Sequence, residues 1–170
     1  MNRFTAVSSG LGSPTNADGL AEFAINGETF FSQSGRLLGA RGFNVAVVDP
    51  QTGHRREPVR TFDPWTSPLT GQALNALADY LESLEPGRLA MIAVCDDAGI
   101  NPIDSCNRHD TPAVERVVQT LTRMGSQKIG SYCYRGAWSF VAVTGQPGAV
   151  AEKLSPGPKV TADVMLPAGP

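Results

Sequence analysis

The 170-residue chain lacks the features that mark membrane and secreted proteins. No apolar run approaches the roughly 18 residues that a membrane-spanning helix needs. Residues 1–10 contain no long apolar stretch of the kind found in a secretory signal. We therefore expect a protein that is made in the cytoplasm without a signal peptide and has no membrane partner.

The chain also has no large net charge of either sign, and it contains few cysteines and histidines. A net charge of −2 gives no electrostatic basis for nucleic-acid binding. Three cysteines, Cys95, Cys106 and Cys133, are an odd number and form no Cys-x-x-Cys pair, so neither a disulfide framework nor a zinc site is expected. His54 and His109 lie far apart, and no Gly-x-Gly-x-x-Gly loop occurs. We expect no metal and no cofactor.

What the chain does contain is turn-forming residues, 18 Gly and 13 Pro, which favour strands over a helix bundle. An Asn26-Gly27 turn predicts a hairpin over residues 21–31. Further strands are expected at residues 43–48, 59–62, 89–94, 129–134, 139–143 and 160–165. Residues 1–20 have little periodicity and are interpreted as an extended arm or loop.

Two helices are expected. Ser67 followed by Pro68 is typical of a helix start, and leucines then recur at three- and four-residue spacing from Leu74 to Leu84. A second helix follows Thr111 and ends at Gly125. The pattern indicates an α+β domain with a β-rich core. We divide the chain into an arm and hairpin (1–35), a central domain (36–146) and a Pro/Gly-rich tail (147–170).

The best candidate for a functional site follows the apolar strand 89–94. Asp96 and Asp97 come directly after it, and Arg135 and Trp138 follow about 40 residues later. An acid, an arginine and an indole suit a polar ligand with apolar faces. Other roles stay open: the aspartates for capping a turn, Arg135 for a structural ion pair, Trp138 for the core. Catalysis is disfavoured because adjacent strand residues point to opposite faces.

The surroundings of that strand contain a series of short motifs with a recognisable order and spacing. They are Arg41-Gly42-Phe43-Asn44-Val45-Ala46-Val47-Val48, Thr52-Gly53, Phe62-Asp63, Ala93-Val94-Cys95-Asp96-Asp97, Met124-Gly125-Ser126, Tyr134-Arg135-Gly136-Ala137-Trp138 and Gly145. This set resembles the interleukin-like EMT inducer domain, also called PANDER-like, over roughly residues 38–146. The family includes secreted cytokine-like proteins and the stem domain of a glycosyltransferase, protein O-mannose N-acetylglucosaminyltransferase.

The resemblance implies a compact β-β-α domain of two mostly antiparallel sheets with two or three short helices. It also implies a binding module and no catalytic residues. The glycosyltransferase stem domain binds a sugar through an acid after the central strand and an arginine of an Arg-x-x-Trp motif. The matching positions are Asp96 and Arg135, with Trp138 completing the motif and Arg41 matching a basic residue before the first family strand.

We expect a non-catalytic carbohydrate-binding module with a glycan as its ligand. The Ala-, Gly- and Pro-rich composition favours a bacterial or phage origin, and a phage tail or fibre component that attaches to a host glycan is one hypothesis. The alternative is a structural virion or tail assembly protein whose arm and tail contact other protein chains and whose domain binds no sugar. Trp65, in a loop, is a candidate platform or partner contact. A glycan hydrolase would need a second carboxylate across a cleft from the first, and the sequence offers no strong candidate pair.

Overall fold

The computed structural model describes residues 1–10, 12, 18–34, 39–66, 69–100, 111–146, 150–157 and 159–169. Within these ranges the chain forms nine β-strands, two α-helices and short 3-10 turns. The strands are β1 (Asn2–Gly10), β2 (Leu20–Ile25), β3 (Glu28–Gln33), β4 (Gly42–Val48), β5 (Arg60–Phe62), β6 (Leu89–Asp96), β7 (Ala137–Val143), β8 (Val150–Ser155) and β9 (Val160–Leu166). The helices are α1 (Gln72–Glu82) and α2 (Thr111–Arg123), and the 3-10 turns are η2 (Pro64–Thr66) and η3 (Ile129–Ser131).

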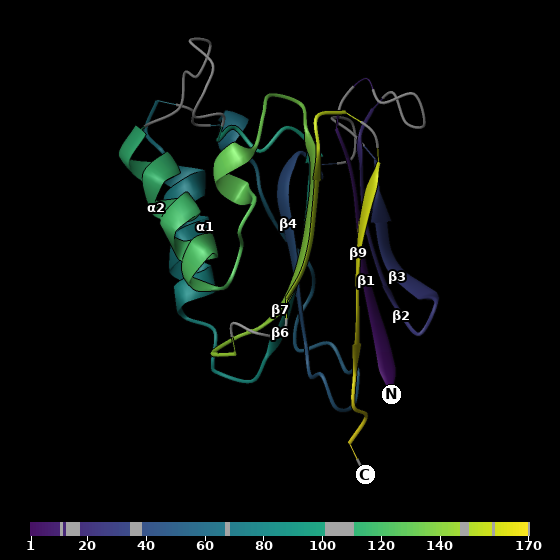
Figure 1. The fold of residues 1–170 in the computed structure, drawn as a ribbon. Coiled ribbons are helices and arrows are strands. Elements are labelled where there is room, and N and C mark those ends of the chain that lie inside the picture. Colours follow the sequence, from purple (N-terminus) through teal and green to yellow (C-terminus); the bar gives the residue numbers. More distant parts are fainter. Residues whose placement is uncertain are drawn as a thin grey trace.

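The strands lie in two layers, and both helices cover the outer side of one layer (Figure 1). One layer has the order β5-β4-β6-β7-β8, and its strands pair antiparallel. The other has the order β3-β2-β1-β9, also antiparallel. Two parallel residue pairs, Ser9 with Cys95 and Gly10 with Asp96, join the end of β1 to the end of β6. All nine strands therefore belong to one hydrogen-bonded sheet.

Strand β6 is buried along its whole length because it separates two apolar cores. Ile92 and Val94 belong to the core beneath the helices, which also contains the apolar faces of α1 and α2. Met91 and Ala93 belong to the core between the two strand layers. A strand that is covered on both faces reads as a continuous apolar run, which explains why residues 89–94 are so easily predicted from the sequence.

Most of the predicted elements are confirmed. The hairpin turns at Asn26, which has φ 54°, and at Gly27, and α2 begins at Thr111. A sheet-rich fold with two α-helices agrees with the predicted α+β class. The finer arrangement, a β-β-α domain of two separate sheets, is not confirmed, because the β1–β6 link connects all the strands.

Two secondary-structure predictions are wrong. Residues 2–10 form β1 rather than an arm or loop, with Phe4 and Ala6 facing the core and Arg3 and Thr5 alternating with them. Residues 129–134 form η3 and a turn rather than a strand. There the amides of Ser131 and Tyr132 donate to the carbonyls of Lys128 and Ile129, which closes the chain into tight turns. Strand β8 was not predicted.

The first helix begins at Gln72, after Gly71 in the left-handed conformation with φ 61°. Ser67 and Pro68, which were expected to start it, lie outside the described residues. The same is true of Cys106 and His109, which fall among residues 101–110. The predicted arm and tail boundaries stay a prediction, although β1 and β9 pair with each other within the chain. No helix among the described residues is long and apolar enough to cross a membrane.

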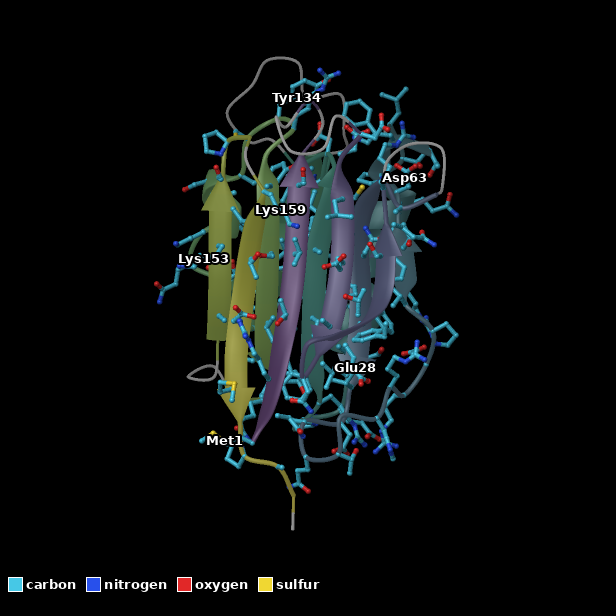
Figure 2. All side chains as sticks on the ribbon, turned by 90° about the vertical axis from the view of Figure 1, so that its right-hand side faces the viewer. Met1, Glu28, Asp63, Tyr134, Lys153 and Lys159 are labelled. Atoms are coloured by element: carbon cyan, nitrogen blue, oxygen red, sulfur yellow. The ribbon has the colours of Figure 1, made fainter. Side chains whose placement is uncertain are left out.

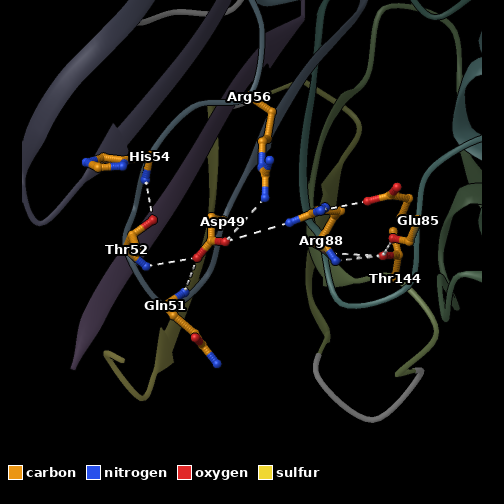
Figure 3. Close-up of polar contacts among 8 residues, drawn as sticks. All are labelled: Asp49, Gln51, Thr52, His54, Arg56, Glu85, Arg88 and Thr144. Atoms are coloured by element: carbon orange, nitrogen blue, oxygen red, sulfur yellow. Dashed lines mark hydrogen bonds and ion pairs between the residues drawn. The ribbon is translucent and has the colours of Figure 1, made fainter. Parts of the chain in front are cut away.

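The turn after β4 is held by a polar network (Figure 3). The Asp49 carboxylate accepts the amides of Gln51 and Thr52, each at 3.0 Å. It also lies 3.8 Å from Arg56 and 3.7 Å from Arg88. The Thr52 amide, followed by the Gln51 amide and the charge of Arg56, lowers the pKa of Asp49. The charges in this network are already paired, so it serves to anchor the turn.

Candidate functional site

Three of the four predicted site residues meet at the end of the molecule where β6 and β1 finish. A cavity of about 60 Å³ lies there, and three predicted residues, Arg41, Asp96 and Arg135, line it. Trp65, Asp97 and Tyr134 complete the lining. Figure 2 places Asp63 and Tyr134 at this end, far from Glu28 and Met1. The volume equals that of roughly two water molecules, at about 30 Å³ each, so the cavity holds one chemical group of a ligand.

Both aspartates line this cavity because the chain turns sharply at Asp96. Asp96 has φ 65°, and the Asp97 amide donates to the Cys95 carbonyl at 2.8 Å. This hydrogen bond between residues i and i+2 closes a three-residue γ-turn, and with a positive φ at its centre such a turn is rare and strained. In a regular strand, successive side chains alternate between the two faces. This alternation ends at Asp96, so it does not separate the two aspartates. The sequence argument that adjacent aspartates face opposite sides is wrong at this position.

Gly10, at the end of β1, and Gly19, just before β2, allow the backbone to pack closely against the site. A Cβ on Gly10 would lie 1.8 Å from the Arg135 carbonyl oxygen, and one on Gly19 would lie 2.6 Å from the Asp96 amide nitrogen. Both distances are shorter than any non-bonded contact permits. The N-terminal segment, predicted to be an extended arm or loop, therefore packs against the backbone of both Arg135 and Asp96.

Arg41 is positioned by Asp63. Its Nε lies 3.0 Å from both carboxylate oxygens, and its Nη2 lies 2.9 Å from Oδ2. Asp63 Oδ1 also accepts the backbone amide of Trp65 at 3.0 Å. One carboxylate thus fixes the guanidinium and the start of the loop that bears the indole. The charge of Arg41 is neutralised by this bidentate pair.

Aromatic rings and Arg135 form the rim of the cavity. The Trp65 and Tyr134 rings meet edge to face, with centroids 6.4 Å apart. The Arg135 guanidinium lies 4.8 Å from the Tyr134 ring centroid. Tyr134 is 44% exposed. Arg135 makes no ion pair with another residue in the described part of the chain.

Trp138 lies outside the cavity. Its side chain is fully buried in the core beneath the helices, stacked on Phe140 with ring centroids 5.4 Å apart. Its Nε1–H donates to Glu152 at 2.7 Å. The structure therefore gives Trp138 the core role that the sequence left open, and the exposed aromatic surface of the site comes from Trp65 and Tyr134.

Asp97 is the most unusual group in the cavity. Its side chain is 2% exposed, and its Oδ1 accepts the Gly99 amide at 3.0 Å. Its Oδ2 is buried without a hydrogen-bond partner in the described part of the chain. Burial raises the pKa of Asp97 to about 6, against the amides of Gly99 and Arg135, which lower it; the charge of Asp96 raises it further.

A pair of variants measures the backbone strain at Arg135, which has φ 59°. We expect Arg135→Gly to be about 0.5–1 kcal/mol more stable than Arg135→Ala, because only glycine adopts this conformation without a steric penalty. Both variants lack the guanidinium, so urea unfolding compares the backbone alone. An alanine variant as stable as the glycine variant contradicts the presence of strain.

A larger hollow of about 860 Å³ lies at the opposite end, between the β2–β3 turn and residues 52–58. Arg55 stacks there on Phe30, 5.2 Å from the ring centroid. The hollow contains no buried carboxylate without a partner, so we place the functional site at the smaller cavity. In the described part of the chain, no three metal-binding side chains are grouped for an ion.

Comparison with known proteins agrees with the resemblance seen in the sequence. The chain is 30% identical over 134 residues to the human cell migration-inducing and hyaluronan-binding protein, which covers 79% of this chain and 8% of the relative. The mouse protein of the same name is 29% identical over 126 residues, covering 74% and 8%. Protein FAM3C of Danio rerio is 27% identical over 105 residues, covering 62% and 39%.

The chain thus spans less than a tenth of the length of the two hyaluronan-binding relatives and 39% of the length of Protein FAM3C. The sequence profile of the interleukin-like EMT inducer family matches residues 41–146, which contain Arg41, Asp96, Asp97 and Arg135. The match includes more than half of the chain and all the residues that line the candidate cavity. The chain belongs to the interleukin-like EMT inducer family.

Proposed function

We propose that this chain is a non-catalytic carbohydrate-binding domain whose site is the cavity at the end of β6. The observation that carries the proposal is the convergence of Arg41, Asp96 and Arg135 on one cavity, beside two aromatic rings. These residues come from segments far apart in the sequence. The sugar inserts one polar group into the cavity, and the rest of the sugar lies against the rim.

The chemistry of the lining suits a sugar. Carboxylate oxygens accept hydrogen bonds from hydroxyl groups, and a guanidinium donates to ring and hydroxyl oxygens. The apolar face of a pyranose packs on an indole or phenol ring, which Trp65 and Tyr134 offer at the rim. Arg135 has no ion pair among the described residues and is available for a ligand.

Two further observations support binding rather than catalysis. Hydrolysis of a glycosidic bond needs carboxylates on both sides of that bond, about 5–10 Å apart. Asp96 and Asp97 are adjacent in the chain and line the same cavity, so they do not flank a bond from opposite sides. The relatives that cover most of this chain carry hyaluronan binding in their name, and hyaluronan is one polysaccharide to test.

A second candidate is a structural role in an assembly such as a phage tail, in which the domain docks neighbouring chains and binds no sugar. The observation in its favour is the open hydrogen-bonding edge of β3, which pairs with β2 alone in the described sheet. An exposed strand edge is a template for pairing with another chain. This candidate predicts self-association or a protein partner in place of glycan binding.

The first experiment compares glycan binding by the wild type, Arg135→Ala and Arg55→Ala. The panel consists of N-acetylchitotriose, mannotriose and a hyaluronan hexasaccharide, measured by calorimetry. Arg55 is a matched control because it also stacks on an aromatic ring, at the opposite end of the molecule. We expect Arg135→Ala to weaken binding roughly 10- to 100-fold, the loss of one charged hydrogen bond, and Arg55→Ala to have no effect. Equal effects of the two substitutions, or no binding by the wild type, would contradict the proposal.

A further inference from the structure

Asp97 Oδ2 is a buried acceptor that the described part of the protein leaves unused. The Asp97 side chain is 2% exposed, yet it lines the cavity. Its Oδ1 accepts the Gly99 amide at 3.0 Å, while Oδ2 has no partner. A buried polar atom without a hydrogen bond is rare in native proteins and costs about 1–3 kcal/mol.

The groups around Asp97 are already engaged. Tyr132 has one hydroxyl proton, and the Gly136 carbonyl accepts it at 2.9 Å, whereas Asp97 Oδ1 lies 3.5 Å away. The same hydroxyl accepts the Ala98 amide at 3.1 Å. Tyr132 is therefore unable to supply a donor to Oδ2.

The two arginines of the site do not satisfy Oδ2 either. Arg41 is held by both oxygens of Asp63. Arg135 stacks on Tyr134. The backbone amide of Arg135 lowers the pKa of Asp97, yet Oδ2 has no hydrogen-bond partner among the described residues. A group that carries a proton and enters the cavity from outside would supply one.

We propose that Asp97 is the residue that determines ligand specificity in this cavity: its Oδ2 accepts a hydrogen bond from a hydroxyl or N–H group of the bound sugar. This inference rests on the proposed function, because it concerns the same site. The cavity then takes a hydrogen-bond donor and disfavours a group that can only accept, such as the carboxylate of a uronic acid.

Protonation of the Asp97 carboxylate changes the hydrogen-bonding role of Oδ2. Because Oδ1 already accepts the Gly99 amide, the proton of the neutral acid resides on Oδ2 and turns the acceptor into a donor. The pKa of Asp97 is about 6, so the change falls in a range that is easily measured. Among the described residues, the other titratable and charged groups beside Asp97 are Asp96, Tyr132, Arg41, Tyr134 and Arg135, and Cys133 lies close to Tyr132.

The test is the pH profile of N-acetylchitotriose affinity between pH 5 and pH 7.5. This probe is neutral and carries both hydroxyl and N–H donors. At pH 5, one unit below the pKa of about 6, roughly a tenth of Asp97 is ionised, so we expect about a 10-fold loss of affinity from pH 7.5 to pH 5.

Asp97→Asn gives the sharpest comparison. Its amide oxygen takes the place of Oδ1 on the Gly99 amide, and its NH2 group replaces Oδ2 with a permanent donor. We expect this variant to bind at every pH at least as weakly as the wild type at pH 5, because it never offers the ionised acceptor. Asp79→Asn, at an exposed ion pair on α1, should keep the wild-type profile.

The outcomes separate this inference from the proposed function. A wild type that binds N-acetylchitotriose equally at pH 5 and pH 7.5, or an Asp97→Asn variant with the wild-type profile, overturns the role of Asp97 and leaves the proposed function intact. A wild type that binds none of the panel glycans at any pH overturns both.

Discussion

Trp138→Ala is expected to lower the free energy of unfolding by about 3–5 kcal/mol, the usual cost of removing a large buried aromatic side chain. The ring is fully buried between Phe140 and Phe43, whose centroids lie 5.4 Å and 6.2 Å away. The substitution also removes the Nε1 donor from Glu152. Urea unfolding followed by circular dichroism measures the loss.

Trp65→Ala is the control for this prediction. Trp65 is the other tryptophan, it is only partly buried, and it lines the candidate cavity. Its removal should affect glycan binding much more than stability. A Trp138→Ala variant with wild-type stability is incompatible with a core role for Trp138 and would return it to the binding site.

Asp97→Asn should have the opposite effect on stability. We expect it to raise the free energy of unfolding by about 3 kcal/mol at pH 7.5, since a pKa of about 6 against an ordinary 3.8 means that the folded protein disfavours the charged carboxylate. The amide carries no charge, keeps the size of the side chain and removes this penalty. Chemical unfolding at several pH values measures the gain.

The sign and the pH range follow from the direction of the shift. An acid with a raised pKa binds more protons in the folded state, so its contribution to stability is fully present below about pH 4. This contribution is lost as the pH rises towards 6, and above that pH the stability no longer changes with the ionisation of Asp97. The gain from Asp97→Asn should therefore be small at pH 4 and complete near pH 7.5.

Asp79→Asn serves as the control for this experiment too, because its carboxylate is 68% exposed and should matter little at any pH. If Asp97→Asn is destabilising at pH 7.5, the buried carboxylate is satisfied in a way that the structure does not account for. A stabilising substitution that also weakens glycan binding is the pattern expected of a functional residue, which a protein keeps at the expense of stability.

The sequence predicts the central strands well because their residues are apolar on both faces. Residues 89–94 and 43–48 fall within β6 and β4. The hairpin around Asn26 and the start of α2 at Thr111 follow from turn and cap residues. In each case the local pattern and the tertiary environment favour the same structure.

The strand β1 is missed because its end is made of small polar residues. Ser8 and Ser9 are fully buried where β1 meets the other layer. The Ser8 hydroxyl accepts the Trp138 amide at 2.9 Å and donates to the Val94 carbonyl. Ser8 thereby links β1 to β6 and β7, a role that depends on tertiary contacts and leaves no periodic pattern in the sequence.

The site is predicted in part. Asp96, Arg135 and Arg41, which the family resemblance named, line one cavity, and their role in binding stays a prediction. The contribution of Asp97 depends on the γ-turn at Asp96, and the side on which Trp138 lies depends on the position of β7 in the sheet. Backbone conformation at single residues and strand register are properties that composition and spacing do not determine.

The measurement that tests the central claim most directly is a titration of the 15N-labelled protein with N-acetylchitotriose, and separately with the hyaluronan hexasaccharide, followed by NMR. Amide and side-chain signals of Arg41, Trp65, Asp97, Tyr134 and Arg135 report on the cavity at the end of β6. Signals of Phe30, His54 and Arg55 report on the larger hollow at the opposite end. We predict saturable shifts confined to the first group with at least one of the two probes. Shifts confined to the second group, or none with either glycan, would contradict a carbohydrate site at this cavity and favour a role in assembly.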